Sequence, residues 1–213
     1  MGSSLNLSKI KEELARRASM LKGTVVKVGI PYGKHYPDGT SVAYVATIQE
    51  FGASIPAHEV HPKNAKLLAF PGKDGKTVFA KKVTIPEVTI PPRPFMRMTR
   101  TAKQKEWANL LVEGSEAVMQ RRISLYGMLD AVGQVAAMDI VQTIANRVPP
   151  PLAQSTIQGR IHRAQKANPR FGSKKMPVTL SQPLDDTGTL VASISYGTGK
   201  VGEDFDNGTP ANL

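Results

Sequence analysis

The stretch from residue 99 to residue 147 contains no proline, although the whole chain has 16. Apolar residues recur in it at steps of three and four, the spacing that places side chains on one face of an α-helix. Two segments show this spacing, at 107–119 and 125–144, and Gly114 is expected to break or bend the first. The run VPPP at 148–151 ends the second, because proline cannot continue a helix. The sequence therefore predicts a long central pair of helices.

Before this region the chain alternates between helix and strand signals. Residues 5–21 carry apolar side chains at helical spacing, which predicts an amphipathic N-terminal helix that stops at Gly23. Residues 24–31 are rich in valine and are predicted to form a strand. Residues 42–51 favour a short helix ended by Gly52, although their β-branched residues leave a strand possible.

A hairpin is predicted between residues 68 and 85. Two β-rich runs, 68–70 and 78–85, surround the turn sequence PGKDGK. Proline cannot donate to a strand ladder, so the flanking prolines are expected to keep neighbouring segments from extending it. These prolines are Pro62, Pro86, Pro91 and Pro92.

The C-terminal third changes character. Residues 148–183 are polar, basic and interrupted by prolines, with one short helical piece at 155–165. Residues 184–213 predict a short helix through Leu190, then a strand and a tail. We therefore predict an α+β core domain at 1–147, a proline-rich basic linker or arm at 148–183, and a short helix–strand element with its tail at 184–213.

The predicted fold class is α+β. A small, mostly antiparallel sheet with a hairpin is expected to be packed by the N-terminal helix and the long central helix pair. An extended C-terminal arm completes the expected architecture. A chain of 213 residues with 40% hydrophobic content is long enough to bury such a core.

Charge and composition limit the function classes. A net charge of +11 makes an acidic partner, a polyanion or an electrostatically assembled ring plausible. The chain has no cysteine, which excludes disulfides, thiolate metal sites and cysteine nucleophiles. It has no apolar run of about 18 residues, so we expect no membrane span and no export signal, with synthesis in the cytoplasm.

No catalytic motif is recognisable. The sequence HEVH at 58–61 resembles a zinc-protease motif, but its histidines are three residues apart instead of four and prolines bracket it. We interpret His58 and His61 as exposed loop residues. A phosphate-binding glycine loop and a serine-hydrolase elbow are also missing. We therefore expect no enzyme activity, no cofactor, no metal and no small-molecule substrate.

Nucleic-acid binding is the alternative from another class. Basic pairs occur at 16–17, 81–82 and 121–122, and a longer basic stretch spans 160–175. Such patches bind polyanions without reading sequence. Aromatic residues are only 6% of the chain and no known DNA-binding motif is present, so we interpret the clusters as solvated faces and salt-bridge partners between subunits in preference to direct nucleic-acid recognition.

The segment TIPPRPFMRMTR at 89–100 lies between strand-like and helical sequence. Pro94 restricts Arg93 to extended conformations and sets the direction in which the next helix begins. Phe95 is large enough to anchor that helix against the sheet. Arg93 and Arg97 are permanently charged, and each can form a bidentate ion pair with a carboxylate. Glu50 and Asp186 are the candidate carboxylates. The segment is predicted to be a rigid corner of the fold, with a direct interface role as the alternative.

Three segments together resemble the neck and tail-completion proteins of tailed phages, a family that includes virion morphogenesis proteins and tail components. The first two are VAYVATIQEFGAS at 42–54 and IPPRPFMR at 90–97. The third is residues 183–196, in which Pro183 and Leu184 precede DDTGTLVASISY. The hairpin segment at 67–86 is similar to an insertion common between the first two. The resemblance spans most of residues 5–196.

The resemblance implies a structural virion protein that forms an oligomeric ring at the head–tail junction and joins head to tail. The ring would contain six copies more readily than twelve, and its partners would be head-closure, tail-terminator or tail-tube proteins. Incidental contact with packaged DNA is expected, and the alternative function is a non-specific DNA-binding accessory factor in packaging or recombination. The expected location is the virion, after assembly in the host cytoplasm.

The resemblance also selects the residues expected at an interface or at the corner of the fold. Asp186 or Thr187 is additionally expected to cap the helix that carries Leu190, and a close backbone approach is expected at Gly188. The full set is Glu50, Phe51, Gly52, Arg93, Pro94, Phe95, Arg97, Asp186, Thr187, Gly188, Leu190 and Ser193.

Overall fold

The computed structural model describes residues 23–62, 66–71, 76–167, 181–202 and 209–210, together with five residues near the N-terminus. Those five (Lys11, Glu12, Ala15, Arg16 and Ser19) are helical and exposed. The rest of the predicted N-terminal helix, including its apolar face, lies outside the described residues.

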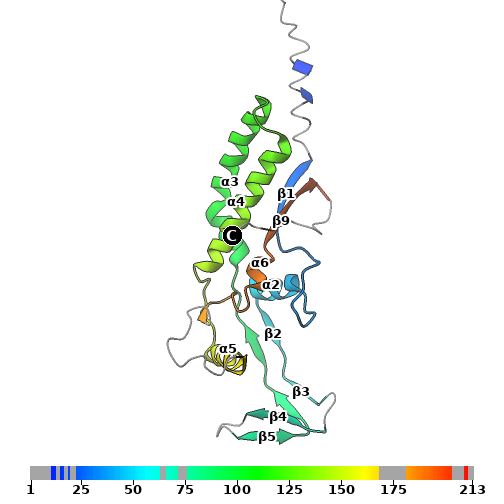
Figure 1. Cartoon of the computed structure of the whole chain (residues 1–213), viewed down its shortest axis with the longest axis vertical. Coiled ribbons are helices and arrows are strands. Elements are labelled where there is room, and N and C mark those ends of the chain that lie inside the picture. Colours follow the sequence, from blue (N-terminus) through cyan, green and yellow to red (C-terminus); the bar gives the residue numbers. More distant parts are fainter. Residues whose placement is uncertain are drawn as a thin grey trace, which may run out of the picture.

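Two long helices form the largest element, as predicted. Helix α3 (Phe95–Met119) and helix α4 (Leu125–Ala145) lie side by side (Figure 1). The predicted break in the first helix is wrong, because α3 continues through Gly114 without interruption. Met128 of α4 packs against this glycine and leaves no room for a Cβ atom. The glycine therefore permits a close approach of the two helices.

A small antiparallel sheet packs against α4. Strand β1 (Thr24–Gly29) pairs with β8 (Ser195–Lys200) in a register that runs from Thr24 opposite Lys200 to Gly29 opposite Ser195. Strand β9 (Thr209–Pro210) pairs with the other edge of β8. The first predicted strand thus finds its partner near the opposite end of the sequence.

One hydrophobic core joins distant parts of the chain. Helix α2 (Val42–Phe51) and the short helix α6 (Thr189–Ala192) close it at the base of the helix pair. Ser41 caps α2, since its side chain accepts a hydrogen bond from the amide of Tyr44. The core includes residues on both sides of the boundaries predicted at 147 and 183. Its buried members are Val42, Ala46, Phe95, Ala137, Ile140, Ile144, Val148, Leu184, Leu190, Ile194 and Tyr196.

The described residues between 53 and 90 form an arm of three nested antiparallel strand pairs. Strand β2 (Ala53–Ile55) pairs with β7 (Val88–Ile90), and β3 (His58–Val60) pairs with β6 (Val83–Ile85). Strand β4 (Leu68–Pro71) pairs with β5 (Thr77–Ala80). Figure 1 shows these pairs following one another away from the helix pair. We refer to residues 53–90 as the hairpin arm.

The hairpin predicted around PGKDGK is confirmed as β4–β5, and its ladder is not extended past the flanking prolines, as expected. The flanking segments also pair with each other, but as two separate two-stranded sheets, β3–β6 and β2–β7. Pro62 and Pro86 lie between consecutive pairs and divide the ladder into short pieces. Proline interrupts the hydrogen bonds locally, while the two sides of the hairpin remain next to each other.

Helix α5 (Gln154–Ala167) confirms the helical piece predicted at 155–165. The described residues include helices α2 to α6 and small antiparallel sheets, so the chain has the predicted α+β fold. None of the described helices combines the length and apolar character needed to cross a bilayer.

Candidate interaction site at the proline–arginine corner

The first and second motif segments meet at the corner between α2, β7 and α3. The amide of Arg93 donates to the carbonyl oxygen of Gln49 at 2.6 Å, and this hydrogen bond holds the two segments together. Gly52 ends α2 with φ of 77°, and a Cβ atom there would lie 2.9 Å from the carbonyl oxygen of Ile90. Both the left-handed backbone and the close approach of Ile90 therefore require glycine at this position.

Glu50 holds the start of α3 in place. Its side chain is only 5% exposed and accepts hydrogen bonds from the amides of Met96 (2.9 Å) and Arg97 (3.1 Å). These amides belong to the first turn of the helix and have no partner within it. The guanidinium of Arg97 adds an ion pair, with Nε 2.9 Å from the Glu50 carboxylate, and its Nη2 donates to the Glu50 carbonyl oxygen at 2.7 Å. Arg97 and Glu50 thus form one of the pairs that the sequence suggested.

Phe51 and Phe95 have opposite environments. Phe95 is fully buried in the hydrophobic core, among residues of α2, α4, α6 and β8, so it anchors α3 to more than the sheet alone. Phe51 is 64% exposed, and the guanidinium carbon of Arg97 lies 4.8 Å from the centre of its ring. This distance is typical of a cation–π contact. Phe51 and Arg97 together form a solvent-facing patch beside the corner.

Arg93 is buried, and it binds main-chain and amide oxygens instead of a carboxylate. Its side chain donates to the carbonyl oxygens of Pro150 (2.9 Å) and Pro151 (3.1 Å) and to Oε1 of Gln49 (3.1 Å). The expectation that Arg93 would bind Glu50 or Asp186 is therefore wrong. Burial, followed by the nearby positive charge of Arg160, lowers the pKa of the Arg93 guanidinium below its ordinary value.

The third motif segment forms the predicted short helix and strand, α6 and β8, but the start of the helix differs from its prediction. Helix α6 begins after Gly188, whose φ of 75° is left-handed, and neither Asp186 nor Thr187 caps it. Gly188 has open space around it, so its backbone angle, and not a close approach, explains the glycine. The hydroxyl of Thr187 pairs with that of Thr189 at 2.8 Å, and Ser193 donates to the carbonyl oxygen of Thr189 at 2.7 Å.

Asp186 instead binds helix α5. It lies 2.7 Å from Nη2 of Arg163 and 3.3 Å from Nε of Arg160. Arg160 is buried and also donates to the carbonyl oxygens of Gln182 and Asp185, at 2.9 Å each. Neither arginine belongs to the three motif segments. Their spacing of three residues on a predicted helix was the only sequence signal that they share a face.

A groove with a volume of about 850 Å³ connects these parts of the site. We call it the β7–α5 groove, because residues 88–90 of β7 and residues from Ser155 to Arg163 of α5 line it. Arg93 and the segment Pro150–Ala153 also line it, and Asp186 and Leu190 do so from the third motif. Its walls are mainly apolar, while its charged groups are three arginines and two aspartates: Arg93, Arg160, Arg163, Asp38 and Asp186.

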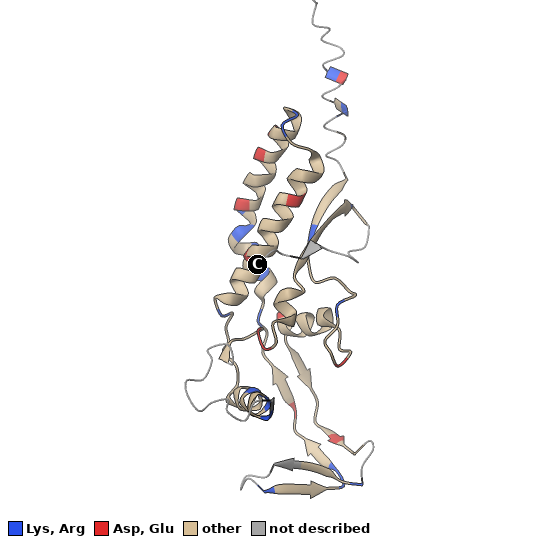
Figure 2. Cartoon of the chain, in the orientation of Figure 1, with Lys and Arg blue, Asp and Glu red and all other residues tan. Residues whose placement is uncertain are grey.

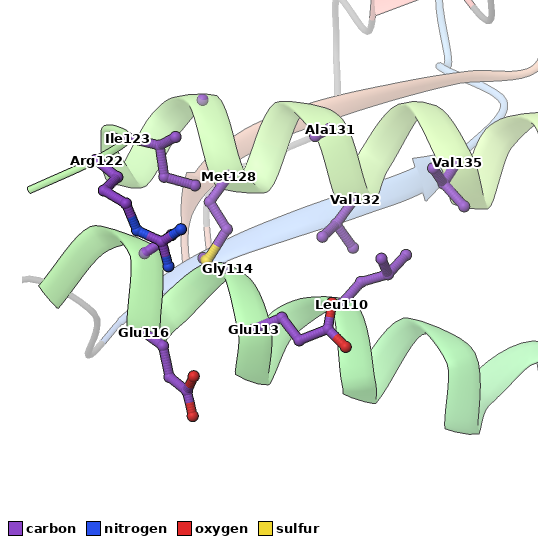
Figure 3. A pocket seen from close by; sticks show the side chains of 12 residues that line it. Leu110, Glu113, Gly114, Glu116, Arg122, Ile123, Met128, Ala131, Val132 and Val135 are labelled. Atoms are coloured by element: carbon purple, nitrogen blue, oxygen red, sulfur yellow. The ribbon is translucent and has the colours of Figure 1, made fainter. Parts of the chain in front are cut away.

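A second hollow, of about 590 Å³, lies between α3 and α4 (Figure 3). Leu110, Met128, Val132 and Val135 supply apolar side chains to it. Figure 3 also shows the side chains of Glu113, Glu116 and Arg122 at this hollow. None of the residues that the resemblance places at an interface or at the corner of the fold lines this hollow.

The HEVH segment forms no metal site within the described residues. His58, Glu59 and Val60 belong to strand β3, so His58 is exposed on a strand and not in the predicted loop. Glu59 binds Lys82 at 2.8 Å and lies 3.7 Å from His61. Across the part of the chain that the structure describes, there is no group of three or more metal-ligating side chains.

In comparisons with protein-family models, curated proteins and solved structures, nothing matches this chain.

Proposed function

We propose that this chain is a structural protein of a tailed-phage virion that forms a ring at the head–tail junction. In this role it completes the neck or tail and mediates the joining of head and tail. The proposal starts from the resemblance of segments 42–54, 90–97 and 183–196. The contacts of Arg97 with Glu50 and of Arg93 with Gln49 bring the first two segments together, and the β7–α5 groove includes residues of all three.

The partners in this proposal are other copies of the chain and other neck and tail proteins. We favour six copies over twelve, with head-closure, tail-terminator or tail-tube proteins as neighbours. The role requires neither catalysis nor a cofactor. The chain would assemble in the host cytoplasm and remain in the virion.

The observation that carries the proposal is the hairpin arm. It extends from the core as isolated two-stranded pairs and exposes several large apolar side chains (Figure 1). Phe79 is 63% exposed, and Ile55, Val78 and Val88 are each at least 40% exposed. Two-stranded ribbons are marginal on their own, and exposed apolar strands tend to pair with other chains. A neighbouring subunit that covers the arm would remove both disadvantages.

The direct test is the number of copies in the intact particle. A reconstruction of the head–tail junction, or quantitative mass spectrometry of purified particles, should find this chain as a ring of six. One or two copies per particle would rule out a ring.

The hairpin arm can be tested separately. Because Val60 and Val83 are paired, residues 61–82 can be replaced by Asn-Gly, a two-residue hairpin turn. The shortened chain should keep the denaturation midpoint of the parent, since no described residue of the removed segment belongs to the hydrophobic core. It should nevertheless fail to join heads to tails in a complementation assay. Normal infectious particles from the shortened chain would contradict a role for the arm.

The basic residues of α5 favour a second candidate, a non-specific DNA-binding accessory factor. Arg160, Arg163 and Lys166 lie on this helix, and Figure 2 shows its concentration of Lys and Arg. Sequence-independent binding needs only such a cluster. The salt dependence described below separates this function from assembly.

A further inference from the structure

We propose that the β7–α5 groove is a docking site for an extended acidic segment of a partner protein. The segment would pair with the free edge of β7 and direct carboxylates toward Arg93, Arg160 and Arg163. The inference rests on the groove alone and does not depend on the place of the protein in a virion.

The first support is the position of strand β7. Val88, Thr89 and Ile90 all line the groove. Successive side chains of a strand point to opposite faces, so a surface that includes three consecutive residues follows the edge of the strand. Within the described residues β7 pairs only with β2, which occupies its other edge. The edge at the groove therefore offers main-chain groups to which an extended peptide can add as a strand.

The second support is unbalanced charge. Arg93 is 4% exposed, and no carboxylate of the described residues lies within ion-pair distance of it. Its three partners are neutral oxygens, whereas Asp186 is shared between Arg160 and Arg163. Asp38 is exposed and binds the amide of Thr40 in its own loop. A buried cation without a counter-charge is unfavourable, so an arriving carboxylate gains from this environment.

The third support is the character of the walls, which favours a polypeptide over DNA. The groove is lined by Val45, Leu152, Leu184 and Leu190, besides prolines. An extended peptide can place apolar side chains against such walls and acidic ones against the arginines, because its side chains alternate. A duplex presents hydrated phosphates and binds best to open basic surfaces.

The experiment uses the full chain and labelled peptides in fluorescence anisotropy. The probe is a peptide of about eight residues, a typical strand length, in which Glu and Thr alternate. A matched peptide has Gln in place of Glu. Two further versions carry N-methyl groups on alternate residues, one in the odd and one in the even positions. A short DNA duplex is measured at the same ionic strength.

The Glu peptide should bind roughly tenfold more tightly than the Gln peptide, because each carboxylate is replaced by a neutral group. One of the two N-methylated versions should lose most of its binding and the other should retain it. Only one edge of a bound strand faces β7, and only amides on that edge are needed. Equal binding of the Glu and Gln peptides, or of both N-methylated versions, would overturn the proposal. Tighter binding of the duplex than of the Glu peptide would overturn it in favour of DNA.

Substitutions in the groove should change the affinity for the Glu peptide in opposite directions. Arg163 is 63% exposed, so Arg163→Gln should leave the fold intact and weaken binding of the Glu peptide several-fold. Asp186→Asn should strengthen it, since the internal competitor for the arginines is removed. The control is Arg100→Gln, an exposed position on α3 outside the groove with the same change in charge. Thermal unfolding confirms that each variant is folded. A loss at Arg163 no larger than that at Arg100 would also overturn the proposal.

Discussion

The carboxylate of Glu50 accepts hydrogen bonds from two main-chain amides and one guanidinium, and all three donors belong to the start of α3. A negative charge at a helix N-terminus is favourable, because the unpaired amides there carry partial positive charge. Glu50 is itself in the last turn of α2. A single side chain therefore fixes the angle between two helices, with Gly52 and Pro94 setting the backbone between them.

Replacing Phe95 by Ala should lower the free energy of unfolding by about 3–5 kcal/mol, because the ring is fully buried and leaves a cavity. The matched control is Phe51→Ala, which removes an exposed ring and should cost about 1 kcal/mol or less. Chemical denaturation of both variants gives the comparison. Similar losses from the two would show that the core is not built around Phe95.

Arg93 and Arg97 should also differ in how much each contributes to the free energy of unfolding. Arg93→Met removes a buried donor from three oxygens and should cost about 2–4 kcal/mol. Arg97→Met should cost about 1 kcal/mol, because Glu50 keeps its two amide donors and the Arg97 side chain is half-exposed. Equilibrium denaturation measures both losses. If Arg93→Met proved the milder change, its contacts with Pro150 and Pro151 would not stabilise the fold.

At the scale of elements, the position of α4 depends on close approaches at two glycines, one in α4 and one in α3. Gly133 faces Tyr196 of β8 and Val26 of β1, and these side chains leave no room for a Cβ atom. Gly114 of α3 meets Met128 of α4 in the same way. Helix α4 thus approaches the sheet at Gly133 and approaches α3 at Gly114, and a larger residue at either point would separate the two elements.

A pair of glycine substitutions tests this packing. Alanine favours a helix by about 1 kcal/mol over glycine, so Gly159→Ala in α5, which has open space, should stabilise the protein. Gly133→Ala should destabilise it by about 1–3 kcal/mol despite the same gain in helix propensity, because overpacking forces α4 away from the sheet. Thermal unfolding shifts of opposite sign are expected. A stabilising Gly133→Ala would mean that α4 and the sheet adjust freely.

At the scale of the whole molecule, the helix pair and the hairpin arm extend in opposite directions from the core (Figure 1). Apolar side chains are exposed on both, including Phe79 on the arm and Val112 and Tyr126 on the helices. The net charge of +11 adds a general attraction for acidic surfaces. These properties suit a subunit that has neighbours on several sides.

The charge also predicts how the free protein meets DNA. If its basic groups serve mainly protein contacts, duplex DNA should bind weakly and without sequence preference. That affinity should fall steeply between about 50 and 200 mM salt, because binding releases counterions. Anisotropy titrations with two unrelated duplexes measure both properties. A tight, sequence-selective complex at the higher salt would support the DNA-binding alternative over assembly.

The elements that could be predicted from the sequence are those with a local signal. The spacing of apolar residues identified α2, α3, α4 and α5, and the PGKDGK turn identified β4–β5. Helix periodicity and turn chemistry act over a few residues, so they can be recognised without knowing which distant segment packs against them. Phe95 as a buried anchor was accessible for the same reason, since it directly follows Pro94 at the start of the helix. For Arg97, Glu50 was one of two candidate partners, and the sequence did not choose between them.

Only the tertiary structure decided the contacts between distant segments. The pairing of β1 with β8, the continuation of the hairpin arm past its prolines, and the partners of Arg93 and Asp186 all depend on where separate elements come to lie. Arg93 and Asp186 each had several plausible partners in the sequence, because charge alone does not specify distance. By itself, the sequence determined which segments are helical and where the chain turns. The packing of those segments determined which charges meet and which remain without a counter-charge in the β7–α5 groove.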